Sequence, residues 1–176
     1  PNGRIPAIVD KGADNLSIFE SGAIMIYLAE KSGKLISSDP TKKAKVLEWL
    51  MFQMGGVGPM MGQAMYFQRI AAPNGQEEPF AIKRYVDETR RLLEVLNTRL
   101  EGREWLAGEE YTIADMATCP WYGALAKGKL YEAGEFLDVA SYTNVQRWAD
   151  AFWARTVVKR GSRVNRAWGA EESQVL

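Results

Sequence analysis

The sequence predicts an α+β fold, in which a small N-terminal part with a strand and a helix precedes a larger part made of helices alone. Three observations predict it. A segment with β-branched residues at 3–10 comes shortly before an amphipathic segment at 21–32. Apolar residues recur at helical spacing over 79–100. A Thr-x-x-Asp pattern of the kind that begins a helix follows at 112–115.

The segment 3–10 is expected to be extended but irregular. Ile5, Ile8 and Val9 favour a strand, whereas Pro6 lies within it. Because proline cannot donate a hydrogen bond to a neighbouring strand, residue 6 requires a bulge, a sheet edge or a cis turn. With a cis peptide bond before Pro6, the N–H and C=O groups of Ile5 are free to pair with an extended peptide ligand. The sequence leaves these three alternatives open.

The next segment predicts a helix over 21–32 with Ser21 as its N-cap. Apolar residues recur at helical spacing after Ser21, and Gly33 follows the last of them. A helix N-terminus presents unpaired backbone N–H groups and a partial positive charge, which suit an anion, and Glu20 places an acidic group beside them. The alternative is a capped surface helix with a solvated glutamate. The preceding extended segment favours the binding site.

Ile5-Pro6-Ala7 followed by Phe19-Glu20-Ser21-Gly22 resembles the glutathione site of the cytosolic glutathione transferases. The resemblance implies a thioredoxin-like N-terminal domain, in which the residue before the cis-proline, here Ile5, pairs with the cysteinyl backbone of glutathione. It also implies that Glu20 and Ser21 hold the γ-glutamyl ammonium and carboxylate. An acidic group next to a helix N-terminus suits such a zwitterion on physical grounds.

In that family a further strand, helix and strand come before the cis-proline, so we expect the thioredoxin-like domain to be incomplete within these 176 residues. The resemblance places the family's activating Tyr, Ser, Cys or Thr/Asn in the loop after the first of those strands. The catalytic residue at the glutathione thiol is therefore expected in the missing segment and is not named.

Ser37-Ser38-Asp39-Pro40 predicts a linker with a domain boundary near Asp39. We predict two domains: 1–38, the C-terminal part of the thioredoxin-like glutathione-binding domain, and 39–176, an all-α C-terminal domain. Within the helical stretch 42–70, the glycines and proline at 55–59 should bend or break the helix. No strand precedes these glycines and no Lys-Ser/Thr pair follows them, which argues against a phosphate-binding loop.

The helix predicted over 79–100 has an apolar stripe and a charged outer face. Three pairs on that face are spaced i,i+4 for ion pairs: Lys83 and Asp87, Arg84 and Glu88, and Arg90 and Glu94. The run 55–92 is similar to the bacterial nu class of transferases, which includes glutathione-dependent disulfide-bond reductases and relatives of the yeast nitrogen-regulator prion protein. In that class an arginine of this helix reaches the neighbouring subunit's glutathione, and Arg84 matches it. A solvated ion-pair face is the alternative.

The remaining motifs are predicted to serve folding and packing and not binding or catalysis. Thr112 and Asp115 form a capping box, so Asp115 is a folding signal and not a catalytic carboxylate. Cys119 is expected to pack as a small apolar residue, and Pro120 to kink its helix. A last amphipathic helix is predicted around 143–155.

Composition excludes several classes of function. The 22 basic and 22 acidic residues cancel, which gives no overall field for a nucleic acid or an anionic membrane. The chain has no histidine, which excludes histidine bases and histidine metal ligands within these residues, and we expect no metal. The single cysteine prohibits an intramolecular disulfide and fits a reducing cytoplasm. We expect a cytoplasmic protein with no nucleic-acid and no membrane partner.

The resemblance implies a homodimeric glutathione-binding enzyme with glutathione as co-substrate. The function predicted is a glutathione-dependent disulfide-bond oxidoreductase that acts on a small-molecule disulfide. Two alternatives stay open: a glutathione S-transferase that conjugates glutathione to an electrophile, and a non-catalytic glutathione-binding module. The binding residues predicted are Ile5, Pro6, Glu20, Ser21 and Arg84.

Overall fold

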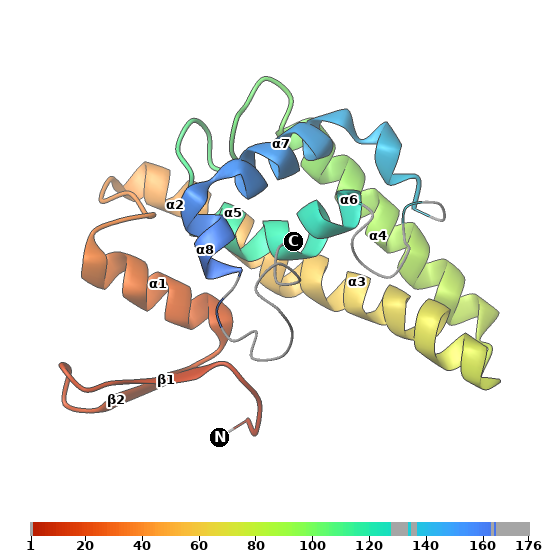
Figure 1. The fold of residues 1–176 in the computed structure, drawn as a ribbon, viewed down its shortest axis with the longest axis horizontal. Coiled ribbons are helices and arrows are strands. Elements are labelled where there is room, and N and C mark those ends of the chain that lie inside the picture. Colours follow the sequence, from red (N-terminus) through yellow and green to blue (C-terminus); the bar gives the residue numbers. More distant parts are fainter. Residues whose placement is uncertain (1, 128–133, 135–136, 163, 165–176) are drawn as a thin grey trace.

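The computed structural model describes residues 2–127, 134, 137–162 and 164. A β-hairpin lies beside helix α1 at one end of the molecule, and the other helices pack around one another (Figure 1). This arrangement confirms the predicted α+β class. The final part of the 39–176 unit, residues 165–176, lies outside the described residues.

The hairpin consists of β1 (Ala7–Asp10) and β2 (Leu16–Phe19), which pair antiparallel with Ala7 opposite Phe19. Its turn contains Asp14 and Asn15 at φ values of 52° and 57°, a left-handed conformation that short polar side chains tolerate. The Ile5–Pro6 peptide bond is cis, which is one of the three predicted alternatives. β1 begins at Ala7, directly after this proline.

Helix α1 (Ser21–Ser32) has the predicted bounds and ends at Gly33, whose φ of 66° is typical of a helix C-terminus. The carboxylate of Asp10 fastens it to the hairpin by accepting hydrogen bonds from the Tyr27 hydroxyl, at 2.6 Å, and from the Lys31 ammonium. The Lys31 and Tyr27 donors lower the pKa of Asp10 to about 2.

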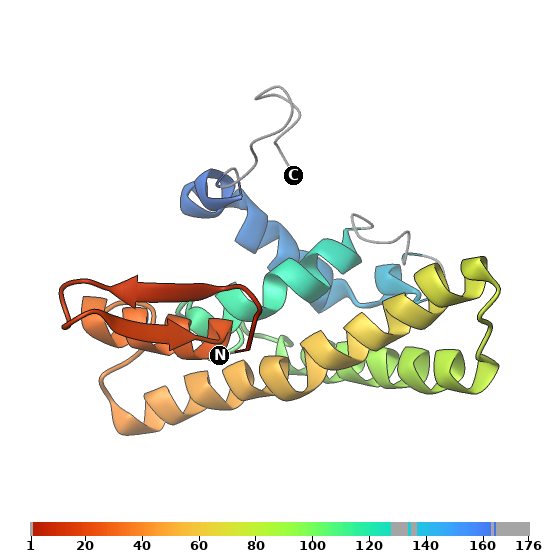
Figure 2. The ribbon, with the colours of Figure 1, turned by 90° about the horizontal axis from the view of Figure 1, so that it is seen from below.

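A long helical rod follows. Asp39 is the N-cap of helix α2 (Pro40–Phe52), and its side chain accepts a hydrogen bond from the Lys42 N–H at 2.9 Å. The helix continues through a π-helical turn (Gln53–Val57) into α3 (Gly58–Met65), a second π-helical turn (Tyr66–Ala71) and a 3₁₀ turn (Ala72–Asn74). Of the two outcomes predicted at 55–59, a bend or a break, the rod shows the bend, and it runs through this stretch without interruption (Figure 2). A π-helical turn accommodates an extra residue without ending the helix.

Helix α4 (Pro79–Arg99) runs back alongside α3 (Figure 1) and buries the predicted apolar stripe. The core helices then follow: α5 (Ile113–Thr118), a π-helical turn (Cys119–Gly123), α6 (Ala124–Ala126), a 3₁₀ turn (Val139–Ser141) and α7 (Thr143–Ala154). The predicted capping box is present at the start of α5. Helix α8 (Thr156–Gly161) is too short to produce the periodicity that would predict it.

The core lies among α2, α3, α4, α5 and α7. Its largest fully buried side chains are Leu50, Met61, Leu92, Leu93, Leu96, Leu100, Leu106, Ile113, Tyr122, Leu125, Leu137 and Trp148. Cys119 is completely buried, as predicted, and burial raises the pKa of its thiol. In the described part of the chain, no helix is long and apolar enough to cross a membrane.

Candidate functional site

Four of the five predicted binding residues lie together where the hairpin meets the start of α1. A hollow of about 150 Å³ is lined by Asn2, Arg4, Ile5, Pro6, Phe19, Glu20 and Ser21. The first four of these residues precede β1, and the other three join the end of β2 to α1. Strand pairing brings these two segments together, because Ala7 is opposite Phe19.

Ile5 forms one wall of the hollow and is 95% exposed. It lies two residues before the first paired residue of β1, at the end of the ladder. An extended ligand that lies along this segment can therefore reach its backbone N–H and C=O groups, in the manner of an added strand.

Glu20 has a strained backbone conformation, with a φ of 72° and a ψ of 120°. Positive φ values are unusual for a residue with a side chain, and strained residues of this kind cluster at functional sites. Its carboxylate lies within the hollow and accepts a long hydrogen bond, of 3.4 Å, from the Asn2 amide.

The prediction that Ser21 is the N-cap of α1 is wrong by one residue. Glu20 occupies the N-cap position and Ser21 is the first helical residue, because the change to helical backbone angles occurs after the left-handed Glu20. Among the residues that the structure describes, no side chain caps this end of α1, and the first turn of the helix has no acidic residue. The backbone N–H groups and the positive end of the helix dipole therefore remain suited to a bound anion.

The Ser21 hydroxyl makes a contact outside the hollow. Its Oγ atom lies 4.0 Å from the sulfur of Met54, at the distance limit of a hydrogen bond to sulfur. A thioether is a weak acceptor. The hydroxyl proton therefore stays available to a stronger acceptor, such as a carboxylate.

Together these groups match a zwitterion. Glu20 offers a carboxylate for an ammonium group, while Ser21, the N-terminus of α1 and the nearby Arg4 suit a carboxylate. The hollow is smaller than a typical pocket for a whole ligand of several hundred Å³, so it suits one end of such a molecule.

The structure does not bring Arg84 into this hollow. It lies on the exposed face of α4 and borders a separate depression of about 460 Å³, which is also lined by residues of α2 and of the π-helical turn, including Met51 and Gly55. The predicted ion pair between Arg84 and Glu88 is wrong, because Glu88 binds Arg91 through two hydrogen bonds of 2.7 and 2.9 Å. The Arg91 guanidinium lowers the pKa of Glu88.

Of the other predicted ion pairs on this face, the pair of Lys83 and Asp87 is confirmed. Arg84 itself has a more distant electrostatic interaction with Glu88. The Arg84 side chain is exposed at the edge of the depression.

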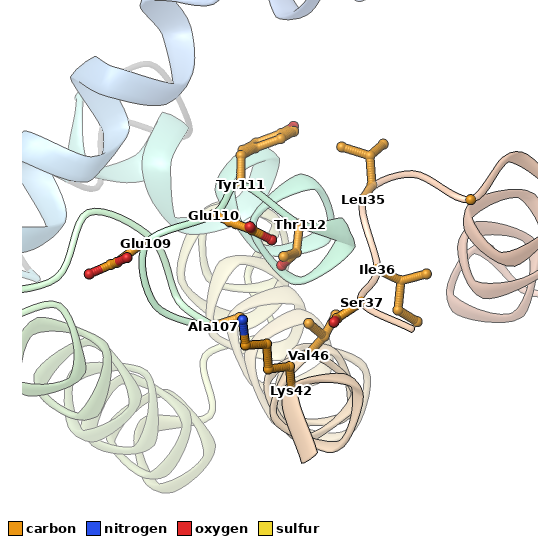
Figure 3. A pocket seen from close by; sticks show the side chains of 11 residues that line it. Leu35, Ile36, Ser37, Lys42, Val46, Ala107, Glu109, Glu110, Tyr111 and Thr112 are labelled. Atoms are coloured by element: carbon orange, nitrogen blue, oxygen red, sulfur yellow. The ribbon is translucent and has the colours of Figure 1, made fainter. Parts of the chain in front are cut away.

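Another cleft, of about 430 Å³, lies elsewhere, between the segment joining α1 to α2 and the loop before α5 (Figure 3). Lys42 and two glutamates, Glu109 and Glu110, lie along it, and burial raises the pKa of the lining Tyr111 to about 12. None of the predicted binding residues lines this cleft. Among the described residues, no group of three or more acidic, cysteine or histidine side chains could hold a metal ion.

Comparison with known proteins decides the family. The family described as "Glutathione S-transferase, C-terminal domain" matches residues 59–156, which is more than half of the chain. The chain belongs to the glutathione S-transferase family. The resemblance expected from Ile5-Pro6-Ala7 and Phe19-Glu20-Ser21-Gly22 is confirmed at this level.

Two curated relatives of this transferase-family chain come from Escherichia coli K12. Disulfide-bond oxidoreductase YfcG is 46% identical over 159 residues, covering 88% of this chain and 69% of YfcG. Disulfide-bond oxidoreductase YghU is 43% identical over 176 residues, covering 99% of this chain and 60% of YghU. The chain thus spans roughly two thirds of the length of these relatives.

Among solved structures, a glutathione transferase from Burkholderia graminis is 47% identical, with a TM-score of 0.88 over 96% of this chain and 70% of that one. That protein was crystallised with two glutathione molecules bound per subunit. The agreement in fold covers almost all of the present chain.

Sequence reasoning missed three residues of the site. Arg4 and Asn2 enter the hollow only because the strand pairing folds the first residues over the start of α1. Met54 reaches Ser21 from 33 residues away. Local patterns carry no signal for such a contact, whereas the charge of Arg4 next to a predicted anion site was an available hint.

Proposed function

We propose that this transferase-family protein is a glutathione-dependent disulfide-bond oxidoreductase. The observation that carries the proposal is the hollow in which Ile5, Pro6, Glu20 and Ser21 meet. Further support comes from the oxidoreductase names of two relatives and from the two glutathione molecules in the Burkholderia graminis protein.

Each residue has a role in the proposal. The Ile5 backbone pairs with the cysteinyl unit of glutathione beside Pro6, the Glu20 carboxylate binds the γ-glutamyl ammonium, and the Ser21 hydroxyl with the α1 N-terminus binds the γ-glutamyl carboxylate. Three anchors of this kind fix the direction of the tripeptide and hence the position of its thiol. Orientation of the reacting atoms is a large part of catalysis.

Two glutathione molecules complete the proposed reaction. The thiolate of the first attacks one sulfur of the disulfide substrate, forms a mixed disulfide and releases the other half as a thiolate, which takes up a proton. The thiolate of the second attacks the glutathione sulfur of that mixed disulfide, which yields glutathione disulfide and releases the remaining half as a thiol. Cys119, the one cysteine among these 176 residues, is buried and has no role in the proposal, which assigns both attacking thiols to glutathione.

The proposal includes a homodimer in which Arg84 binds the glutathione of the partner. Arg84 is exposed at the depression between α2 and α4, and the large apolar side chains of Met51 and Phe80 on these two helices are 51% and 81% exposed. Apolar exposure around a cation is typical of a surface that another molecule covers. The planar guanidinium suits a terminal carboxylate.

The proposal also keeps the division into domains 1–38 and 39–176 and a location in the cytoplasm. The division follows the helix ends, since α1 ends at Ser32 and α2 begins at Pro40. A reducing compartment supplies the reduced glutathione that the reaction consumes.

Replacing Glu20 and Ser21 together with alanine tests the assignment. Loss of hydrogen bonds to charged groups, about 1.5–3 kcal/mol, should weaken the binding of reduced glutathione about 10- to 100-fold in calorimetric titration. The matched control is Ser37→Ala with Glu109→Ala, a serine and a glutamate of the separate cleft, and it should bind as the wild type does. Equal affinity of wild type and the Glu20/Ser21 variant would reject the assignment.

A further inference from the structure

The first turn of α1 rests on a side chain from the helical part of the molecule. Besides its 4.0 Å contact with the Ser21 hydroxyl, Met54 lies against the backbone of Gly22, which is buried. A methyl group added to Gly22 would lie 3.2 Å from the Cγ, Sδ and Cε atoms of Met54. The whole outer part of the methionine therefore lies across this turn.

The π-helical turn after α2 holds Met54 in place. Met54 is its second residue, and the preceding Gln53 is 3% exposed. Single π-helical turns within α-helices frequently occur at functional sites. Met54 is half-buried, with its sulfur facing Ser21. The turn thus directs a polarisable side chain towards the site.

We propose that Met54 is a positioning residue for the glutathione site. Its thioether sulfur accepts a weak hydrogen bond from the Ser21 hydroxyl. When a ligand carboxylate binds, the hydroxyl donates to that carboxylate instead. The hydrocarbon part of Met54 packs against Gly22 and so supports the first turn of α1. This inference rests on the proposed function, because the carboxylate is that of the γ-glutamyl group.

The proposal gives Met54 two effects, a weak hydrogen bond with the Ser21 hydroxyl and packing against the first turn of α1. Different side chains at position 54 test them separately. Leucine keeps most of the volume but offers no acceptor, so it should preserve packing and leave the hydroxyl free. Glutamine has a similar length but offers a strong acceptor that competes with the ligand for the hydroxyl proton. Alanine removes the support of the turn.

The test is calorimetric titration with reduced glutathione of Met54→Leu, Met54→Gln and Met54→Ala, each also in a Ser21→Ala background. Met54→Leu should bind within about twofold of wild type, whereas Met54→Gln and Met54→Ala should each bind about fivefold more weakly. With Ser21→Ala, the Leu and Gln variants should agree within about twofold, since the shared hydroxyl is gone. A side chain at position 54 that does not reach the Ser21 hydroxyl would give the same difference between Gln and Leu in both backgrounds.

Equal glutathione affinity of Met54→Gln and Met54→Leu, both with Ser21 unchanged, would overturn the inference. If Met54→Gln does not fold, the test depends on Met54→Ala. A Met54→Ala protein that binds glutathione as tightly as wild type overturns the inference. Wild-type protein that binds no glutathione overturns the proposed function together with this inference, whereas wild-type binding without coupling overturns the inference alone.

Discussion

Replacing Asp115 with alanine is expected to lower the free energy of unfolding by about 3–5 kcal/mol, because its carboxylate satisfies buried donors from three parts of the core. Oδ1 accepts from the Leu106 N–H at 2.8 Å and from the Trp148 indole N–H at 3.0 Å. Oδ2 accepts from the N–H and hydroxyl of Thr112 at 3.0 and 3.2 Å. The Asp115 side chain is completely buried.

The magnitude follows from the donors left behind. Alanine leaves three buried N–H groups without an acceptor, and each costs about 1–3 kcal/mol. Part of this is offset, because burial raises the pKa of Asp115 and its removal recovers the cost of desolvating the carboxylate. The remainder is a large fraction of the stability of an ordinary domain, about 5–15 kcal/mol.

Urea unfolding followed by tryptophan fluorescence measures this change. Asp115→Asn should lower the free energy of unfolding by less, about 1–3 kcal/mol. Its amide oxygen can keep the two Oδ1 hydrogen bonds, while its NH₂ group faces the Thr112 N–H donor. Glu101→Ala, at an exposed residue just after α4, is the control and should stay within about 0.5 kcal/mol of wild type. An Asp115→Ala protein within about 1 kcal/mol of wild type would refute the assignment of Asp115 as a central anchor of the core.

Two further predictions concern charges outside the core. Because Lys31 and Tyr27 lower the pKa of Asp10 from 3.8 to about 2, its contribution to stability is present above pH 3.8 and is lost as the pH falls towards 2. The thermal midpoint of wild type should therefore fall more steeply over that range than that of Asp10→Asn, and parallel curves would contradict this. Arg84→Ala should weaken glutathione binding about tenfold without dissociating the proposed dimer in sedimentation, whereas Lys83→Ala should change neither. Normal glutathione binding by Arg84→Ala would mean that Arg84 belongs only to a solvated charged face of α4.

Local signals in the sequence were sufficient for much of the fold. The bounds of α1, the apolar stripe of α4 and the capping box of α5 all depend on residues close together in the chain, and all three are confirmed. The glycines and proline at 55–59 predicted a bend or a break and left the choice open; the chain bends, with residues 53–57 in a π-helical turn and Pro59 inside α3. Helix-breaking residues do not reveal whether tertiary packing will hold the turn.

The site was predictable in part for the same reason. Ile5, Pro6, Glu20 and Ser21 belong to two short motifs, and strand pairing brings these motifs to one hollow. The N-cap shifted to Glu20 because its left-handed backbone is a three-dimensional feature. Glu88 pairs with Arg91 and not with Arg84. Both arginines have helical spacing to Glu88, so only the side-chain geometry decides between them.

Titration of the intact protein with reduced and then oxidised glutathione, followed by turnover of hydroxyethyl disulfide on the same preparation, tests the central claim most directly. The proposed oxidoreductase should bind both forms and reduce the disulfide, with one glutathione disulfide formed for each substrate disulfide consumed. Binding of glutathione with no reduction of the disulfide would contradict the proposed reaction, and absence of binding would contradict the site itself.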